Sequence, residues 1–254
     1  MSDYRISFQL YSARNFPPLE AQLETLAAIG FDGVEPYRGC YGDDPEGFRR
    51  MIDSVGLKCP TAHIPVDLLL SDRAAFIGIA ETLGVEAAVL PYLVEEERPR
   101  DRAGWTAFAG KLAEAVPALA ERGIKLAWHT HAFEYEPLSD GFRPIEALIA
   151  PAGMYYEPDI GWITRSGADV VAELTRFPGR VVAFHVKDTA PPGVTADDGW
   201  TDVGAGTIDW SALWPTIAAS GCDLLVFEND NPSDWEGFAR NSYRFVSGLT
   251  GRKG

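Results

Sequence analysis

Three observations predict an α/β protein with one domain, a (β/α)8 or TIM barrel over residues 1–254. Short β-rich segments alternate with amphipathic helical segments along the whole chain, and this alternation implies a parallel sheet. Eight such units, each of about thirty residues, account for the full length, and eight parallel strands close into a barrel. After several helices, a glycine stands directly before an apolar strand.

The predicted strands are short runs of apolar and β-branched residues. They are Ile6–Leu10, Gly33–Glu35, Lys58–Ala62, Ala87–Pro91, Lys125–His129, Met154–Pro158, Val181–His185 and Asp223–Glu228. Between them, apolar residues recur at the three- and four-residue spacing of a helix that is buried on one side. The clearest predicted helices are Leu19–Ile29, Arg73–Leu83, Trp105–Glu121, Gly167–Arg176 and Trp210–Ala219.

The glycines mark where helices end. The segments AIGFDGVE, TLGVEAAVL, ERGIKLAW and ASGCDLLVF each place a glycine where a helix C-cap needs left-handed backbone geometry. A doubly wound open sheet is the alternative fold. It is disfavoured because no predicted strand is followed by a GxGxxG or GxxxxGK[ST] loop.

The charge and composition of the sequence disfavour some classes of binding partner. The net charge of −15 disfavours binding to nucleic acid, because a polyanion is repelled by an acidic surface. The sequence contains no run of 18 apolar residues, so it predicts no membrane span. The N-terminus lacks the pattern of a signal peptide, and the three cysteines are widely spaced, so we expect a cytoplasmic protein.

All four histidines fall at or just after the C-terminal end of a predicted strand. His63 lies in PTAHIP, His129 and His131 in AWHTHAFE, and His185 in AFHVKD. A single histidine is usually structural. Because the C-terminal ends of barrel strands converge on one face, four such positions instead predict a functional site there.

Carboxylates occupy equivalent places. Asp159 ends the sixth predicted strand, Glu228 ends the eighth, and Glu134 follows the fifth. Buried carboxylates need partners or a cation, and mixed oxygen and nitrogen ligands suit Mn²⁺, Mg²⁺, Co²⁺ or Zn²⁺. The set from strands five to eight therefore predicts a site for one divalent metal ion. Glu35, at the end of the second strand, is interpreted on its own as a helix cap or ion-pair partner.

Other residues near the predicted mouth suit a small polar ligand. Lys187 and Asp188 are placed either to hold a hydroxyl or phosphate group or to pair on the surface. Trp128, Trp162 and Trp200 suit either the apolar face of a sugar ring or core packing.

The segments KLAWHTHAFEY, YEPDIGWITRSG, VVAFHVKD, DVGAGTIDW and VFENDNPSD resemble the sugar phosphate isomerase/epimerase superfamily of xylose isomerase-like barrels. The resemblance is clearest over residues 120–240. That superfamily also holds ketose 3-epimerases, inosose dehydratases and class II apurinic endonucleases.

The resemblance implies that Asp159, His185 and Glu228 bind the metal, with Mn²⁺ as the first candidate. The ketose epimerases complete the ligand set with a glutamate on strand five. Here that position is His129, and the nearest acid is Glu134. Both stay candidates, with a slight preference for Glu134, because a second carboxylate matches the charge that the superfamily places on its metal.

The implied function is a metal-dependent sugar isomerase or epimerase. It would remove a proton next to a carbonyl group through a metal-stabilised enediolate. Glu228 is the candidate base, with His129 or Glu134 as the acid. The candidate substrate-binding residues are His63, His131, Lys187 and Trp162.

Three alternatives remain open. A dehydratase or lyase would eliminate a β-leaving group from an inosose or 3-keto sugar. A class II apurinic endonuclease normally needs more metal ligands and a basic groove, which the charge of −15 disfavours. A noncatalytic partner subunit would tolerate loss of a metal ligand. The expected partner is a small sugar, and a homo-oligomer is possible.

Overall fold

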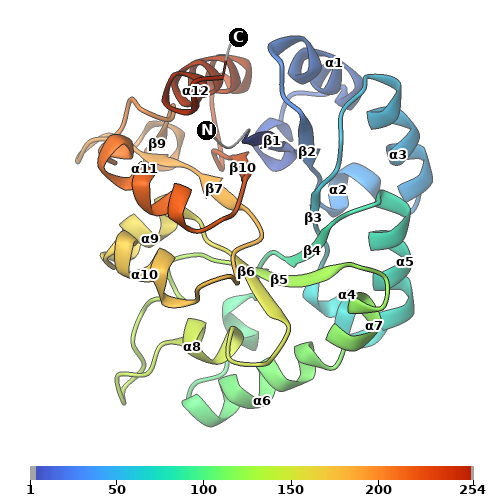
Figure 1. The fold of residues 1–254 in the computed structure, drawn as a ribbon, viewed down its shortest axis with the longest axis vertical. Helices are drawn as coiled ribbons and strands as arrows, with labels where there is room; N and C mark the ends of the chain where they lie inside the picture. Colours follow the sequence, from blue (N-terminus) through green and yellow to red (C-terminus); the bar gives the residue numbers. More distant parts are fainter. Residues whose placement is uncertain (1–3, 253–254) are drawn as a thin grey trace.

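The computed structural model describes residues 4–252 and shows a barrel of parallel strands inside a ring of helices (Figure 1). The barrel strands are β1 (Arg5–Gln9), β2 (Gly33–Glu35), β3 (Thr61–His63), β4 (Ala87–Leu90), β5 (Lys125–His129), β6 (Met154–Glu157), β7 (Phe184–Val186) and β10 (Leu224–Phe227). They pair in two arcs, β2-β1-β10-β7 and β3-β4-β5-β6. Parallel bridges from Gly33 to Lys58 and from Asp159 to His185 join the arcs, so the predicted (β/α)8 fold is confirmed.

The helices of residues 4–252 are α1 (Leu19–Ile29), α2 (Arg38–Tyr41), α3 (Pro45–Ser54), α4 (Val66–Ser71), α5 (Arg73–Leu83), α6 (Arg102–Ala113), α7 (Val116–Ala120), α8 (Pro144–Leu148), α9 (Ile160–Ser166), α10 (Val170–Arg176), α11 (Trp210–Ala219) and α12 (Trp235–Thr250). Short 3-10 turns cover Leu10–Ala13, Glu95–Glu97 and Ala196–Gly199, and the strands β8 (Asp188–Thr189) and β9 (Trp200–Thr201) pair antiparallel beside the barrel. None of the described helices combines the length and apolarity that a membrane crossing needs.

Most predicted boundaries hold within a few residues, and the exceptions have local causes. The single helix predicted at Trp105–Glu121 is two helices, α6 and α7. Pro117 lies in the first turn of α7, where its missing N–H group is tolerated, whereas it would break a continuous helix. Gly30 and Gly84 end α1 and α5 with φ angles of 110° and 69°, which residues other than glycine rarely adopt.

Hydrophobic residues fill two regions of different size. The main core lies between the strands and the ring of helices. A small second cluster, formed by Ala183, Leu224 and Val226, lies inside the barrel. Because alternate residues of a strand share a face, this inner cluster continues directly into His185 and Glu228 at the strand ends. The barrel interior therefore changes from apolar to polar toward its C-terminal mouth.

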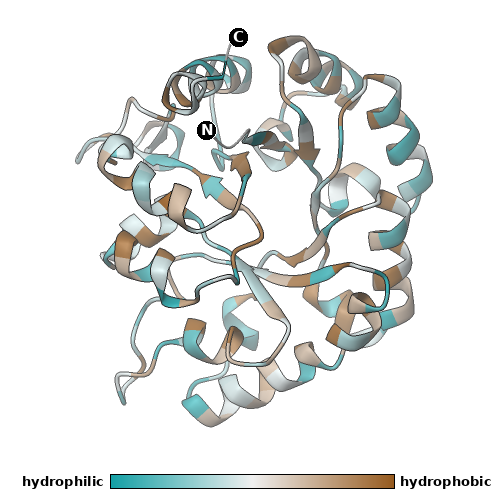
Figure 2. Cartoon of the chain, in the orientation of Figure 1, coloured by the Kyte–Doolittle hydropathy of each residue, from teal (hydrophilic) through white to brown (hydrophobic). Residues whose placement is uncertain are grey.

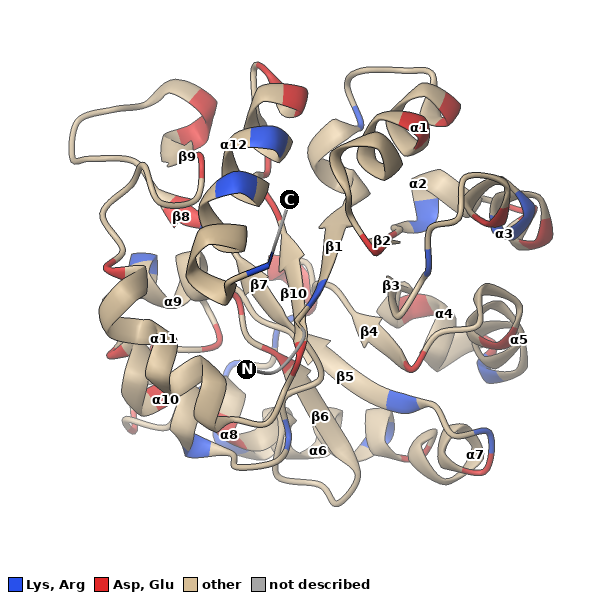
Figure 3. Cartoon of the chain, turned by 45° about the horizontal axis from the view of Figure 1, so that its top comes forward, with Lys and Arg blue, Asp and Glu red and all other residues tan. Residues whose placement is uncertain are grey.

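The outer surface carries the polar residues that this core excludes. Hydrophilic residues lie along the outer edge of the ring, for example in α3 (Figure 2). Charged residues of both signs lie on outer helices such as α3 and α12 (Figure 3). The charged residues inside the barrel therefore differ in environment from those on its surface.

Asp188 fixes the long connection between β7 and β10. It is fully buried, and its carboxylate accepts hydrogen bonds from the backbone N–H groups of Gly204, Gly206 and Ile208 and from the indole nitrogen of Trp210. A Cβ atom at Gly206 would lie 2.2 Å from Asp188 Oδ1, so the carboxylate needs glycine there. Asp188 thus has a structural role, and neither a substrate contact nor a surface pair.

We predict that Asp188→Ala lowers the free energy of unfolding by about 3 kcal/mol, because several buried donors lose their acceptor together. Urea unfolding followed by circular dichroism measures this loss. The matched control is Asp169→Ala, which removes one N-cap hydrogen bond to Ala172 and costs about 1 kcal/mol. Equal losses in the two variants would contradict the anchoring role.

Candidate active site

A cavity of about 850 Å³ opens at the C-terminal mouth of the barrel. Three of the four histidines, His63, His129 and His131, line it, and His185 is fully buried in contact with two of them. The predicted convergence of the histidines is therefore found. Aromatic side chains form much of the remaining wall; they are Tyr11, Tyr37, Tyr92, Phe133 and Trp162.

The first of two side-chain groups, here called the outer group, consists of His129, Asp159, His185 and Glu228. Their potential ligand atoms all lie within 4.8 Å of one another, and all four side chains are buried. His185 Nδ1 lies 3.0 Å from Glu228 Oε2 and 3.9 Å from Asp159 Oδ2. Two nitrogen and two oxygen donors form a set that divalent transition metals accept.

Asp159 provides a test of whether this group fits a cation. Its Oδ1 atom caps α9 by accepting a hydrogen bond of 2.8 Å from the N–H of Trp162. Its Oδ2 atom is buried without a hydrogen-bond partner among the described residues. Burial raises the pKa of Asp159 to about 7, although the charges of Lys187 and His185 lower it. A divalent cation would supply the partner that this oxygen lacks.

Lys187 lies beneath the cavity and contacts the carboxylates of the outer group. Its Nζ atom is 3.3 Å from Glu228 Oε2 and 3.7 Å from Asp159 Oδ2, and it also pairs with Asp230. Burial raises the pKa of Glu228, but the charges of Lys187 and His185 outweigh that effect and hold it below its usual range. Glu228 therefore stays ionised. Because Lys187 is fully buried and absent from the cavity wall, its position does not bring it to a substrate.

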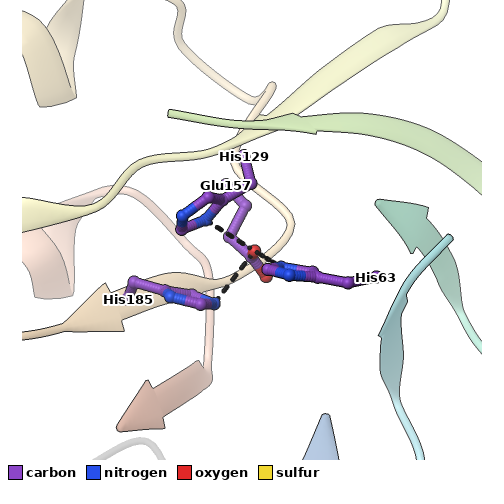
Figure 4. A group of neighbouring side chains, drawn as sticks. All are labelled: His63, His129, Glu157 and His185. Carbon is purple, nitrogen blue, oxygen red and sulfur yellow. Dashed lines mark hydrogen bonds and ion pairs between the residues drawn. The ribbon is translucent and has the colours of Figure 1, made fainter. Parts of the chain in front are cut away.

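The second group, here called the inner group, consists of His63, His129, Glu157 and His185 (Figure 4). Glu157 Oε2 lies 3.0 Å from His63 Nε2, 3.1 Å from His129 Nδ1 and 3.0 Å from His185 Nε2. The sequence reasoning missed Glu157. The signal was present, because Glu157 and Asp159 are alternate residues and share one face of the same extended segment.

Glu35 extends the inner group on the opposite side. Its Oε1 atom accepts a 2.7 Å hydrogen bond from Gln9 Nε2 and lies 2.8 Å from His185 Nε2 and 3.1 Å from His63 Nε2. Of the two roles considered for Glu35, the structure shows an ion-pair partner and not a helix cap, because the β1–β2 register pairs Gln9 with Glu35 inside the barrel, where Glu35 contacts two histidines. Burial raises the pKa of both glutamates. At Glu35, the charges of His63 and His185 outweigh the effect of burial, so the pKa of Glu35 falls. At Glu157, the charge of Glu35 adds to the effect of burial, so the pKa of Glu157 rises.

Glu134 stands apart from both groups. Its Oε1 atom accepts a 2.8 Å hydrogen bond from Trp128 Nε1, and its Oε2 atom accepts one of 2.7 Å from the backbone N–H of His131. Burial raises the pKa of Glu134 to about 7. The preference for Glu134 over His129 at strand five is therefore not supported by this geometry, because both of its oxygens already bind donors. Trp128 is likewise buried and does not reach the mouth.

His131 and Trp162 form part of the cavity wall. Their rings lie 5.4 Å apart, and the ring of Tyr92 packs edge-on against His131 at 4.9 Å. Burial and the charge of Lys187 lower the pKa of His131 to about 3, so its ring is neutral. Its Nδ1 atom is buried and has no hydrogen-bond partner among residues 4–252.

Comparison with known proteins places this geometry in context. The chain is 28% identical to the putative L-ribulose-5-phosphate 3-epimerase SgbU of Escherichia coli over 148 residues, which cover 56% of this chain and only 50% of that protein. Its fold matches the crystal structure of a sugar phosphate isomerase/epimerase from Parabacteroides distasonis with a TM-score of 0.80 at 17% identity, covering 100% and 96% of the two chains. It also matches a structure described as the IOLI protein with a binding zinc atom, with a TM-score of 0.78 at 15% identity, covering 98% of each chain.

A family model described as xylose isomerase-like TIM barrel matches residues 23–247, which include every member of the outer and inner groups. The sequence resemblance and the barrel agree with this match. The chain therefore belongs to the xylose isomerase-like TIM barrel family.

Proposed function

We propose that the protein is a metal-dependent isomerase or epimerase that acts on a sugar or keto-sugar, with one divalent cation held by His129, Asp159, His185 and Glu228. The unpartnered, buried Asp159 oxygen within this donor set carries the proposal. When bound, the cation would polarise a carbonyl oxygen and so acidify the neighbouring C–H bond. Mn²⁺ is the first candidate, and Zn²⁺ is supported by the zinc-containing structural neighbour.

Glu228 is the candidate base. It is the carboxylate of the outer group that reaches the cavity wall, with a relative exposure of 5%. Lys187 and His185 keep it ionised and therefore able to accept a proton.

The cavity wall supplies the substrate contacts. His131 offers a polar ring edge, and Trp162 offers a flat aromatic face of the kind that packs against sugar rings. His63 also lines the cavity, but both of its ring nitrogens already contact Gln9 and the inner glutamates. A volume of about 850 Å³ lies within the usual range for small-molecule sites. The relative that matches at 28% identity acts, by its name, on a sugar phosphate, which supports this substrate class.

One observation favours a second candidate, a dehydratase or lyase acting on an inosose or 3-keto sugar. Epimerisation with two carboxylates on opposite faces needs a second acid at strand five. Here that position holds His129, and Glu134 faces Trp128 and the His131 backbone. A single carboxylate base suits a reaction that removes a proton and then expels a leaving group.

We predict that His129→Ala loses most of its bound metal, whereas Glu134→Gln retains close to one equivalent. The reason is that His129 belongs to the donor set and Glu134 does not. Elemental analysis of protein purified without chelator and reloaded with Mn²⁺ or Zn²⁺ measures the stoichiometry. Thermal melting of both variants serves as the control for folding. Loss of metal in Glu134→Gln alone would reverse the assignment.

We predict that Glu228→Gln lowers turnover by about 10²–10⁴-fold, the usual contribution of a general base. The amide keeps one oxygen that can bind a cation, so metal content should fall only a fewfold. Keto-sugars incubated in D₂O and followed by NMR separate the reactions: deuterium at the carbon next to the carbonyl indicates isomerisation or epimerisation, and an enone product indicates elimination. Full activity in Glu228→Gln would assign the proton transfer to another residue.

A further inference from the structure

The orientation of the Gln9 side-chain amide decides which nitrogen of His63 carries a hydrogen. Its Oε1 atom accepts a 3.1 Å bond from the backbone N–H of Tyr11, so its amide nitrogen faces inward. That nitrogen donates to Glu35 Oε1 at 2.7 Å and lies 3.1 Å from His63 Nδ1. A hydrogen on His63 Nδ1 would meet the amide hydrogens of Gln9, so Nδ1 accepts and the Nε2–H group of His63 faces the carboxylates.

The two histidines shared by both groups have equally defined partners. His129 Nδ1 lies 3.1 Å from Glu157 Oε2, and His185 Nε2 lies 2.8 Å from Glu35 Oε1. A carboxylate oxygen accepts hydrogen bonds, so each of these nitrogens carries a hydrogen. The opposite nitrogen of each ring is then the one left for a cation. For His185 this is Nδ1, which faces Glu228 and Asp159; without a cation it lies within hydrogen-bond distance of Glu228, and it would give up its hydrogen there when a cation binds.

We propose that Glu157, together with Glu35, is a positioning residue that fixes the N–H groups of His129 and His185, so that His129 Nε2 and His185 Nδ1 present lone pairs to the cation. This inference rests on the proposed function, because it assigns the cation to the outer group. Histidine ligands of metals generally donate their second ring N–H to a carboxylate or carbonyl group, which sets the tautomer and the ring orientation.

The same geometry shows why the inner group is not assigned a cation of its own. Each of its three imidazole nitrogens lies 3.0 or 3.1 Å from Glu157 Oε2. A cation there would need all three nitrogens without hydrogens. For His63 the hydrogen would then have to move to Nδ1, against the Gln9 amide. The inner group therefore acts on the outer group through His129 and His185.

The first test observes the ring hydrogens directly. The chain has only four histidines, so the long-range ¹⁵N–¹H NMR spectrum of uniformly labelled, Zn²⁺-loaded protein has few signals to assign. We expect His129 as the Nδ1–H tautomer and His185 as the Nε2–H tautomer. The opposite tautomer at either residue would overturn the proposal, whatever the variants show.

The second test measures Zn²⁺ affinity by competition with a chromophoric chelator. We expect Glu157→Gln and Glu35→Gln to bind one equivalent about 10–100-fold more weakly than the wild type, the usual effect of losing such a support. The matched control is Glu173→Gln, which removes a buried carboxylate paired with Arg143 and Arg176 outside the site. It should change stability and leave Zn²⁺ affinity unchanged.

The outcomes separate this inference from the proposed function. Unchanged Zn²⁺ affinity in both Glu157→Gln and Glu35→Gln would overturn the positioning role alone. A wild type that binds no Zn²⁺, or an Asp159→Ala variant that keeps full affinity, would overturn the proposed function. Two equivalents in the wild type, with one lost in Glu157→Gln, would show a cation in the inner group and overturn the positioning role.

Discussion

Both ring nitrogens of the buried His185 face carboxylates, and the polar interior of the barrel depends on these contacts. His185 Nε2 contacts Glu35 and Glu157, and His185 Nδ1 contacts Glu228. None of these side chains could be buried alone, because an unpaired charge inside a protein is strongly unfavourable. Their mutual contacts allow four strands to bring charged residues into the barrel.

The barrel architecture makes these contacts possible. Strand pairing sets Gln9 beside Glu35 and His129 beside Glu157, and it also sets Val226 beside His185. Alternation then sends the polar residues of neighbouring strands to the same side. The apolar layer of Ala183, Leu224 and Val226 lies below these polar residues. The side chains are thus aligned by backbone register.

The sequence was sufficient for those features that depend on local pattern. Apolar and polar alternation, together with the family resemblance, identified Asp159, His185 and Glu228 without any knowledge of strand neighbours. The contacts of Glu157 with His63 and of Glu35 with His185 could not be predicted in this way, because these partners lie on other strands and only the register brings them together. The sequence left the choice between His129 and Glu134 open, because it depends on how the turn after β5 folds. That turn brings the His131 N–H group to Glu134.

Lys187 explains how the barrel accommodates several buried carboxylates at its mouth. Its ammonium group contacts Glu228, Asp159 and Asp230, so one positive charge already offsets part of the negative charge at the mouth. The offset is incomplete, since Asp159 Oδ2 lies 3.7 Å from Lys187 Nζ and has no hydrogen bond to any residue of the described range 4–252. A cation bound only by the folded chain adds stability in proportion to the logarithm of its concentration. Removing Lys187 would therefore leave the metal-free barrel with three clustered carboxylates, while its effect on the cation-bound form would be smaller because the cation supplies the missing charge.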